Sequence, residues 1–330
     1  MDWGLIVSET LRAAVGQEAI VFALAAIGLN LHFGYTGLLN FGQAGFLAMG
    51  AYSTGICVEY LQWSLWAGVG VGIVAAIVLA LILGLPTLRL RADYLAIVTI
   101  AAAEIIRLIA RSVTFGHITG GSSGINGYAD AFYELNPLGD GTYGFGPWRF
   151  DDNRLWVLMV GWGLVGLSSL VVLLLVRSPW GRVIKAIRED EDAARSLGKN
   201  VYAYKVQSLV VGGVIGAFGG MVFAIGNQSV QADNYGTATT FLALTAVILG
   251  GTARVPGPVG GAMILWGLIS FTENILRQAS AEGLLPTAII SGTQVGIVRF
   301  MLVGLALMAL PIFRPQGIFG NRREITFETR

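Results

Sequence analysis

Residues 64–85 read SLWAGVGVGIVAAIVLALILGL and contain no charged side chain. A transmembrane helix needs about 20 mostly apolar residues to cross the hydrocarbon core of a bilayer. This stretch has that length and that composition. We therefore predict that it forms a membrane-spanning helix.

The rest of the chain has the same character. Of its 330 residues 55% are hydrophobic and 12% are charged, and the mean hydropathy is +0.69. Soluble domains are about a quarter charged, so this chain has too few polar side chains to cover a surface in water. Its 46 glycines suit closely packed transmembrane helices. We predict one all-α transmembrane bundle over residues 1–330.

Further apolar runs predict about nine spans in total, with eight to ten compatible with the pattern. Residues 38–60 are interrupted by Gly42, Gln43 and Gly45, the run at 238–250 is short, and residues 277–295 can hide a partial span. The start of the chain lacks a basic signal-peptide region, so its first run is expected to stay in the membrane. The runs besides 64–85 are 17–34, 38–60, 94–111, 154–176, 205–225, 238–250, 258–276 and 296–313.

The basic residues predict the orientation, because Lys and Arg collect in cytoplasmic loops. They occur at Arg89 and Arg91, in the loop 177–203 with Lys205 just beyond it, and in the tail from Arg314 to Arg330. The long loop 112–153 is mainly acidic and is expected outside, as a surface connection or as a docking surface. The N-terminus is then outside and the C-terminus inside.

The sequence does not contain the residues that several classes of function require. The formal net charge of +1 gives no sign of nucleic-acid binding, and the single Cys57 forms no internal disulfide. His32 and His117 lie on separate segments and do not make a catalytic cluster. Gly198-Lys199-Asn200 lacks the rest of a nucleotide-binding loop. We expect a chain that is not an enzyme and binds no cofactor or metal of its own.

The loop 177–203 is longer than a turn between spans requires. After Pro179 and Gly181, Val183, Ile184 and Ile187 alternate with basic residues, which is typical of a helix on the membrane surface. Acids at 189–192 favour the start of a second helix, near 190–197, that ends at Gly198. With Ala193 and Ala194 giving a shallow face, this helix suits a groove on a soluble partner. The alternative is a solvated turn.

Asp192-Ala193-Ala194-x-x-x-Gly198 resembles the E-A-A-x-x-x-G coupling motif of bacterial ABC import permeases, with Asp for Glu and without the I-x-L-P tail. The wider string from Arg177 resembles the LivM-type permeases of branched-chain amino acid transporters. Two further segments resemble the same family: GYTGLLNFGQAGF at 34–46, and GGT with PGPVGGA within 250–262. It covers about residues 24–320.

This resemblance implies a bacterial inner-membrane complex with a LivH-type permease, two cytoplasmic ABC ATPases of the LivG and LivF types, and an extracytoplasmic substrate-binding protein. ATP and Mg²⁺ would be bound by the ATPases. The solute implied is a branched-chain amino acid, with urea, short amides or other amino acids as alternatives. The residues that the resemblance assigns to ATPase coupling are Arg188, Glu189, Asp190, Glu191, Asp192, Ala193, Ala194, Leu197 and Gly198.

Two glycine-rich breaks, at 34–45 and 250–258, are candidates for the translocation path, because irregular backbone at membrane depth is buried in protein or lines a wet cavity. Asn40, Gly42, Gln43 and Gly45 are the candidate path residues; the alternatives are bonds between neighbouring helices and ordinary turns. A secondary transporter or channel remains the competing function, for which Glu104 is the candidate ion site. Glu104 and Arg107 are alternatively a structural pair, and Gly212-x-x-x-Gly216-x-x-x-Gly220 predicts a close helix contact.

Overall fold

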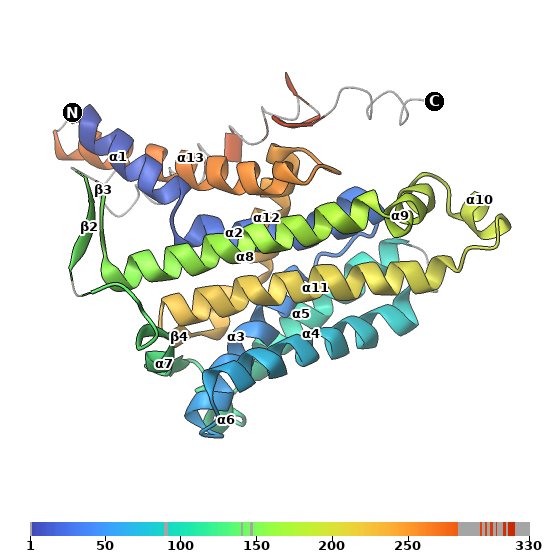
Figure 1. Cartoon of the computed structure of the whole chain (residues 1–330), viewed down its shortest axis with the longest axis horizontal. Helices are drawn as coiled ribbons and strands as arrows, with labels where there is room; N and C mark the ends of the chain where they lie inside the picture. The colour runs from blue at the N-terminus through green and yellow to red at the C-terminus, as the bar shows by residue number, and fades with distance from the viewer. Residues whose placement is uncertain are drawn as a thin grey trace.

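The computed structural model describes residues 2–88, 92–139, 141–145 and 148–282, and beyond these the positions 298, 301, 304–305, 308, 313–314 and 316–320. Over these residues the chain is a bundle of helices, most of which lie roughly along one common direction (Figure 1). Five of the described helices are long and apolar enough to cross a membrane. The fold is therefore the predicted helical bundle.

Helices occupy eight of the nine predicted spans, and their bounds follow the apolar runs closely. The ninth run, 296–313, lies largely outside the described residues, as do Arg89, Arg91, residues 283–295 and the tail 321–330. The total number of spans stays a prediction. The helices that match are α2 (Gln17–Leu29), α3 (Gln43–Glu59), α4 (Leu65–Thr87), α5 (Ala92–Arg111), α8 (Asp152–Arg177), α11 (Val201–Gly226), α12 (Thr237–Gly250) and α13 (Pro256–Ala281).

The first two predicted spans differ in detail from the structure. An additional helix, α1 (Trp3–Ala14), precedes α2 and packs along α13. Beyond α2 the chain continues as a π-helix, η1 (Asn30–Thr36), and Gly37 then adopts a left-handed conformation with φ 72°. Residues 38–42 are not helical, so the run 38–60 becomes a helix only from Gln43. The glycines that interrupt this run thus mark the start of α3.

Helix α11 runs through the centre of the bundle and packs against α2, α3 and α4. Its three spaced glycines allow the close approach. A Cβ at Gly212 would overlap the carbonyl of Gly28 in α2, and one at Gly220 would overlap the carbonyl of Leu47 in α3. The predicted close helix contact is therefore confirmed, because small residues let the backbones meet.

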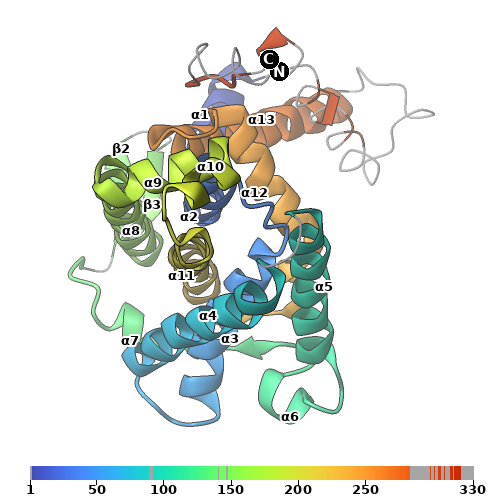
Figure 2. The same ribbon diagram turned by 90° about the vertical axis from the view of Figure 1, so that its right-hand side faces the viewer.

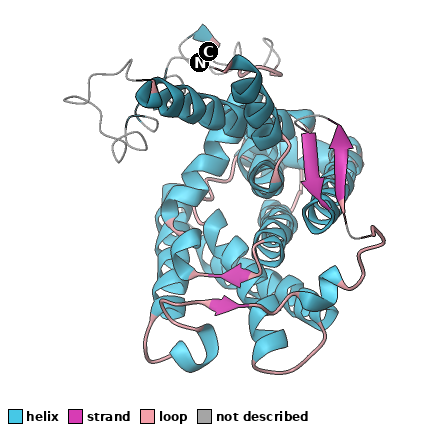
Figure 3. Ribbon diagram, turned by 90° about the vertical axis from the view of Figure 1, so that its left-hand side faces the viewer, coloured by secondary structure: helices cyan, strands magenta, loops and turns pink. Residues whose placement is uncertain are grey.

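Short strands and helices lie at one end of the bundle, which we call the hairpin end (Figure 3). The loop between α5 and α8 forms most of it, and this loop is joined to the connection between α11 and α12 by the pairing of β1 with β4. The elements are α6 (Gly116–Thr119), β1 (Ile125–Asn126), α7 (Asp130–Tyr133), β2 (Thr142–Phe145), β3 (Trp148–Asp151), β4 (Ser229–Val230) and η2 (Ala232–Tyr235).

At the opposite end, which we call the α10 end, α9 (Pro179–Glu189) and α10 (Glu191–Ser196) follow α8 (Figure 2). The backbone N–H groups of Ile318 and Phe319 donate to the carbonyls of Leu249 and Gly250, which close α12 at this end. The described part of the C-terminal segment and the loop 177–203 therefore lie at the same end, as the basic residues predicted.

Candidate coupling helices and central polar cluster

The short helix α10 is built by signals at both of its ends. The Asp190 side chain caps it by accepting from the N–H of Ala193 at 2.9 Å, and Glu191 and Asp192 occupy its first turn, where the helix dipole favours acids. Gly198 ends it with φ 75°. The N–H groups of Gly198 and Lys199 then donate to the carbonyls of Arg195 and Ala194, in a Schellman arrangement. The predicted helix near 190–197 is confirmed, except that Glu189 closes α9 instead of opening α10.

The sequence suggested that Ala193 and Ala194 form one shallow, exposed face of α10. The structure does not show such a face. Ala194 is buried and clusters with Ile187 of α9 and Val201 of α11, so it holds the loop together. Ala193 faces outward. The largest apolar side chain at the tip is Leu197, which is 80% exposed. The exposed surface of α10 is therefore charged, with Leu197 beside it.

Polar contacts fix both helices of this loop to the bundle. The guanidinium of Arg188 donates to the carbonyl of Gly34, and the Lys185 ammonium lies 5.6 Å from the centre of the Tyr35 ring. Glu191 of α10 forms an ion pair with Lys205 of α11. These contacts join α9 to η1 and α10 to α11.

Contacts continue from η1 toward the middle of the bundle. The Thr36 hydroxyl lies 2.7 Å from the hydroxyl of Ser208 in α11, and both are buried. Asn30 holds the turn after α12: its carbonyl oxygen accepts from the N–H of Ala253 at 2.9 Å, and its amide donates to the carbonyl of Arg254 at 2.8 Å. The second glycine-rich break, 250–258, is thus bonded to the start of η1, and η1 leads into the first break.

His32, Asn40 and Gln43 form what we call the central polar cluster, between η1, α3 and α11. The Asn40 amide nitrogen lies 3.1 Å from His32 Nδ1 and donates to Gln43 Oε1, also at 3.1 Å. Asn40 Oδ1 accepts from the N–H of Gly42 at 2.9 Å. If Asn40 donates to Nδ1, the other ring nitrogen of His32 carries the proton and donates to the carbonyl of Leu209 at 3.2 Å.

Gln43 completes this cluster by donating to two backbone carbonyls, of Ala25 and Gly212, at 3.4 and 3.3 Å. Every polar group of the three side chains then has a partner. His32, which the sequence analysis gave no role, is the link between Asn40 and α11. One signal in the sequence could have identified this role: a single imidazole lies among apolar helix residues. A buried imidazole requires hydrogen-bond partners.

Of the candidate path residues, Asn40 and Gln43 are buried within this chain and bonded between helices. Gly42 and Gly45 lie against α5, where a Cβ at Gly42 would overlap the carbonyl of Thr99. In this arrangement they join helices, which is the alternative that the sequence left open. Their assignment to the path stays a prediction.

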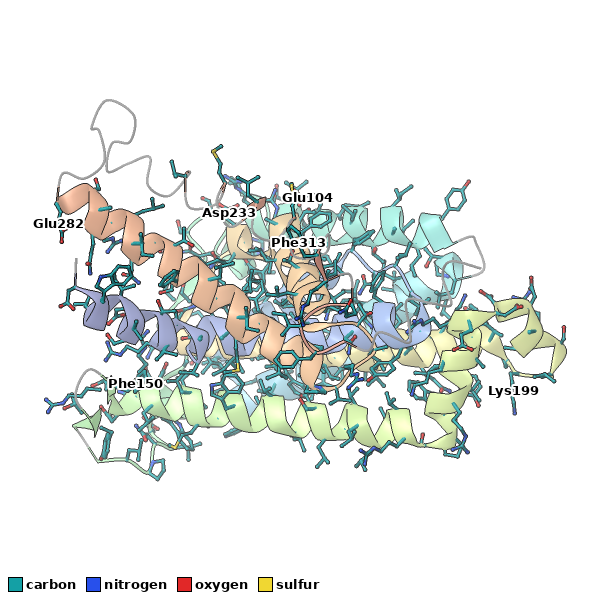
Figure 4. All side chains as sticks on the ribbon, turned by 90° about the horizontal axis from the view of Figure 1, so that it is seen from above. Glu104, Phe150, Lys199, Asp233, Glu282 and Phe313 are labelled. Atoms are coloured by element: carbon teal, nitrogen blue, oxygen red, sulfur yellow. The ribbon has the colours of Figure 1, made fainter. Side chains whose placement is uncertain are left out.

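The charged residues of α5 form a network that reaches η2. Arg107 pairs with Glu104 and, at 3.0 Å, with Asp233, and Arg111 pairs with the same Asp233 at 3.2 Å. Glu104 and Asp233 are seen from above in Figure 4. The predicted pair is confirmed, and its extension to Asp233 ties α5 to the hairpin end.

A family model described as the permease component of branched-chain amino acid transport systems matches residues 14–311. The chain belongs to this permease family. The permease is 30% identical to the high-affinity branched-chain amino acid permease LivM of Escherichia coli, over 97% of this chain and 72% of the relative. It is 26% identical to LivH of the same organism, over 91% of both chains.

A nucleoside ABC transporter permease, NupC of Lactococcus lactis, is also similar, with 23% identity over 85% of this permease and 86% of the relative. The relatives thus include transporters named for solutes of different chemistry. Together, the relatives and the apolar helices make this chain a multi-pass protein of the inner membrane and a transport subunit.

Proposed function

We propose that this permease is one of two membrane subunits of an ATP-driven importer of branched-chain amino acids. Its partners are a LivH-type permease, two cytoplasmic ABC ATPases that bind ATP and Mg²⁺, and an extracytoplasmic binding protein. In this proposal the α10 end faces the cytoplasm. The relatives LivM and LivH, each of which matches more than nine tenths of this chain, support it.

The observation that carries the coupling role is the form of α10. Its tip is exposed, with Asp192 at 90% side-chain exposure and Leu197 at 80%. Its first turn is held to α11 by the pair of Glu191 with Lys205, and the preceding α9 is held to η1 by Arg188. An exposed, capped helix with a fixed base is suited to being held by a soluble partner. Closure of the ATPases on ATP then moves α10, and α9 and Lys205 pass the movement to η1 and α11.

The test changes the exposed tip without touching the base. Leu197→Glu puts a charge into the proposed contact, and we expect the assembled complex to lose most of its transport-coupled ATPase activity. Ala194→Arg is unsuitable, because Ala194 is buried and its replacement disturbs the loop itself. Leu135→Glu is the matched control, since Leu135 is 53% exposed at the hairpin end.

Equal coupling in the two variants, with equal amounts of inserted protein, would contradict the coupling role. Full uptake by this permease alone, without ATPase subunits, would instead support a secondary transporter or channel.

The solute is tested by uptake with a panel of labelled compounds in the complete complex. We expect leucine, isoleucine and valine to be imported, and urea, short amides and a nucleoside to be excluded. Import of urea, a short amide or the nucleoside in place of the branched-chain amino acids would support the importer function but contradict the proposed solute.

A further inference from the structure

A cavity of about 350 Å³, with both polar and apolar walls, lies near the hairpin end, between α1, the start of α2, the start of α8 and the middle of α13. Its volume falls in the range of small-molecule sites, roughly 300–1,000 Å³. Phe150, labelled in Figure 4, marks its border in β3, just before α8. Its edge reaches solvent, because Glu9 is 43% exposed there. The cavity has no place in the coupling route described above.

The walls of this cavity carry charges of both signs. Glu9 and Arg12 form an ion pair at 2.9 Å, and Arg12 is further held by the carbonyl of Arg149. In contrast, the side chains of Glu18 and Arg154 have no hydrogen-bond or ion-pair partner among the residues that the structure describes. Each of them lines the same cavity. Glu18 is half-buried, and burying a charge without a partner is costly, whereas Arg154 is exposed at the rim of the cavity.

Unused hydrogen-bond donors also gather here. Within the described part of the chain, five buried side-chain polar atoms lack a partner, and two of them, Arg12 Nε and Trp266 Nε1, belong to residues that line this cavity. A buried donor without a partner costs about 1–3 kcal/mol, so an occupant that accepts hydrogen bonds is favoured. The Glu18 carboxylate requires the opposite, an occupant that donates.

The wall also has an apolar part, about as large as the polar one. Ile269 and the Trp266 ring, which packs 5.3 Å from the Phe22 ring, supply it. The occupant that fits must therefore offer a carboxylate to the unused donors, an ammonium to Glu18, and a short apolar side chain to Trp266 and Ile269. A free α-amino acid combines these three features.

We propose that this cavity is a binding site for a zwitterionic α-amino acid within the permease, with Glu18 as the ligand of its ammonium and Arg154 as the ligand of its carboxylate. Trp266 Nε1 adds a second donor to the carboxylate. This inference rests on the proposed function for the identity of the solute. A second cavity, of about 520 Å³, shares Gln17, Arg154 and Asn227 with it and extends it toward α7.

The test measures equilibrium binding of labelled leucine to the purified permease–ATPase complex without the binding protein, so that affinity reflects the membrane subunits. We expect Glu18→Gln and Arg154→Gln each to weaken binding roughly tenfold or more, as for the loss of a charged hydrogen bond. Matched controls are Glu59→Gln, at the exposed end of α3, and Arg177→Gln, at the other end of α8. Neither control should change binding.

Two analogues assign the ligand groups. Leucinamide lacks the carboxylate, so Arg154→Gln should leave its affinity unchanged while Glu18→Gln weakens it. The oxo acid of leucine lacks the ammonium. For this analogue Glu18→Gln should therefore leave the affinity unchanged, while Arg154→Gln weakens it. Equal loss for both analogues in both variants would indicate a structural disturbance and overturn the assignment.

Absence of leucine binding by the unmodified complex, or the same affinity in all variants, would mean that the cavity holds water only and would overturn the site. Uptake by the unmodified complete complex is measured in parallel. If leucine is imported while the variants bind it normally, the site fails and the proposed function stands. If leucine is not imported, the proposed function fails, and binding of alanine and glycine to the same variants still tests the site.

Discussion

The central polar cluster and the cavity at the hairpin end both gather polar side chains from several helices, but they differ in how these groups are paired. In the cluster, His32, Asn40 and Gln43 satisfy one another and two backbone carbonyls. In the cavity, Glu18 and Arg154 lack such partners among the described residues. A fully paired group stabilises one packing of helices, whereas an unpaired one is suited to a ligand.

This difference predicts opposite responses to substitution. Replacing a residue of the central polar cluster should lower stability, because its partners lose their hydrogen bonds. Replacing an unpaired residue of the cavity should leave stability nearly unchanged and lower affinity for the solute. Four substitutions test the stability side of the comparison, all by thermal unfolding of the purified permease in detergent.

Gly212→Val should have the largest effect. A Cβ here would overlap both His32 Nε2 and the carbonyl of Gly28, so α11 and α2 must separate. We expect a loss of more than about 3 kcal/mol, at the upper end of overpacking costs. Gly163→Val in α8 is the control, because nothing lies within 4 Å of its Cβ position. A similar loss in both variants would show that the β-branched side chain, and not the contact, is responsible.

Asn40→Leu should come next. It removes the bonds to His32, Gln43 and the N–H of Gly42, and it leaves buried groups unpaired. The expected loss is about 2–3 kcal/mol. The exposed Asn234→Leu should change stability by less than about 0.5 kcal/mol. If Asn40→Leu is as stable as the original chain, the cluster does not hold the helices together.

Thr36→Val should give a smaller loss of about 1 kcal/mol. The substitution keeps the shape of the side chain and removes the bonds to Ser208 and to the carbonyl of Leu31. Thr245→Val, which loses only a bond within its own helix, is the comparison. Equal stability of the two variants would contradict a role for Thr36 in joining η1 to α11.

Glu18→Gln should change stability least, by less than about 0.5 kcal/mol, because no hydrogen bond or ion pair of this side chain is present among the described residues to be lost. A loss comparable to that of Asn40→Leu would show that Glu18 is a structural residue. The contrast between the two regions would then disappear, and the proposed ligand role with it.

Much of the fold follows from local composition. The apolar runs located eight helices, and the acids at 190–192 with Gly198 located α10, because capping and the helix dipole act within a few residues. The runs did not reveal the π-helix η1 or the late start of α3. These depend on the bonds of Asn30 and Asn40 to residues that are distant in the sequence or lie on neighbouring elements.

For the candidate functional residues, too, the sequence predicted some features and the tertiary structure was needed for others. The motif at 192–198 predicted a coupling loop with a short helix, and the structure forms that helix as α10. The inward position of Ala194 and the outward position of Ala193 required the packing of α9, α10 and α11. Asn40 and Gln43 were marked as polar residues within a predicted span, and the structure buries both of them. Whether they face a path or another helix was beyond a single sequence, because hydropathy does not report which neighbour a side chain meets.

The sequence by itself determined that this chain is a helical membrane permease, since length and apolarity decide whether a segment enters a bilayer. It also determined the family and the existence of a projecting helix at one end. Only the tertiary structure decided which polar groups are paired. Hydrogen bonds from α2, η1 and α3 to α11 join segments that lie far apart in the chain, and the cavity that Glu18 and Arg154 line is also formed by distant segments.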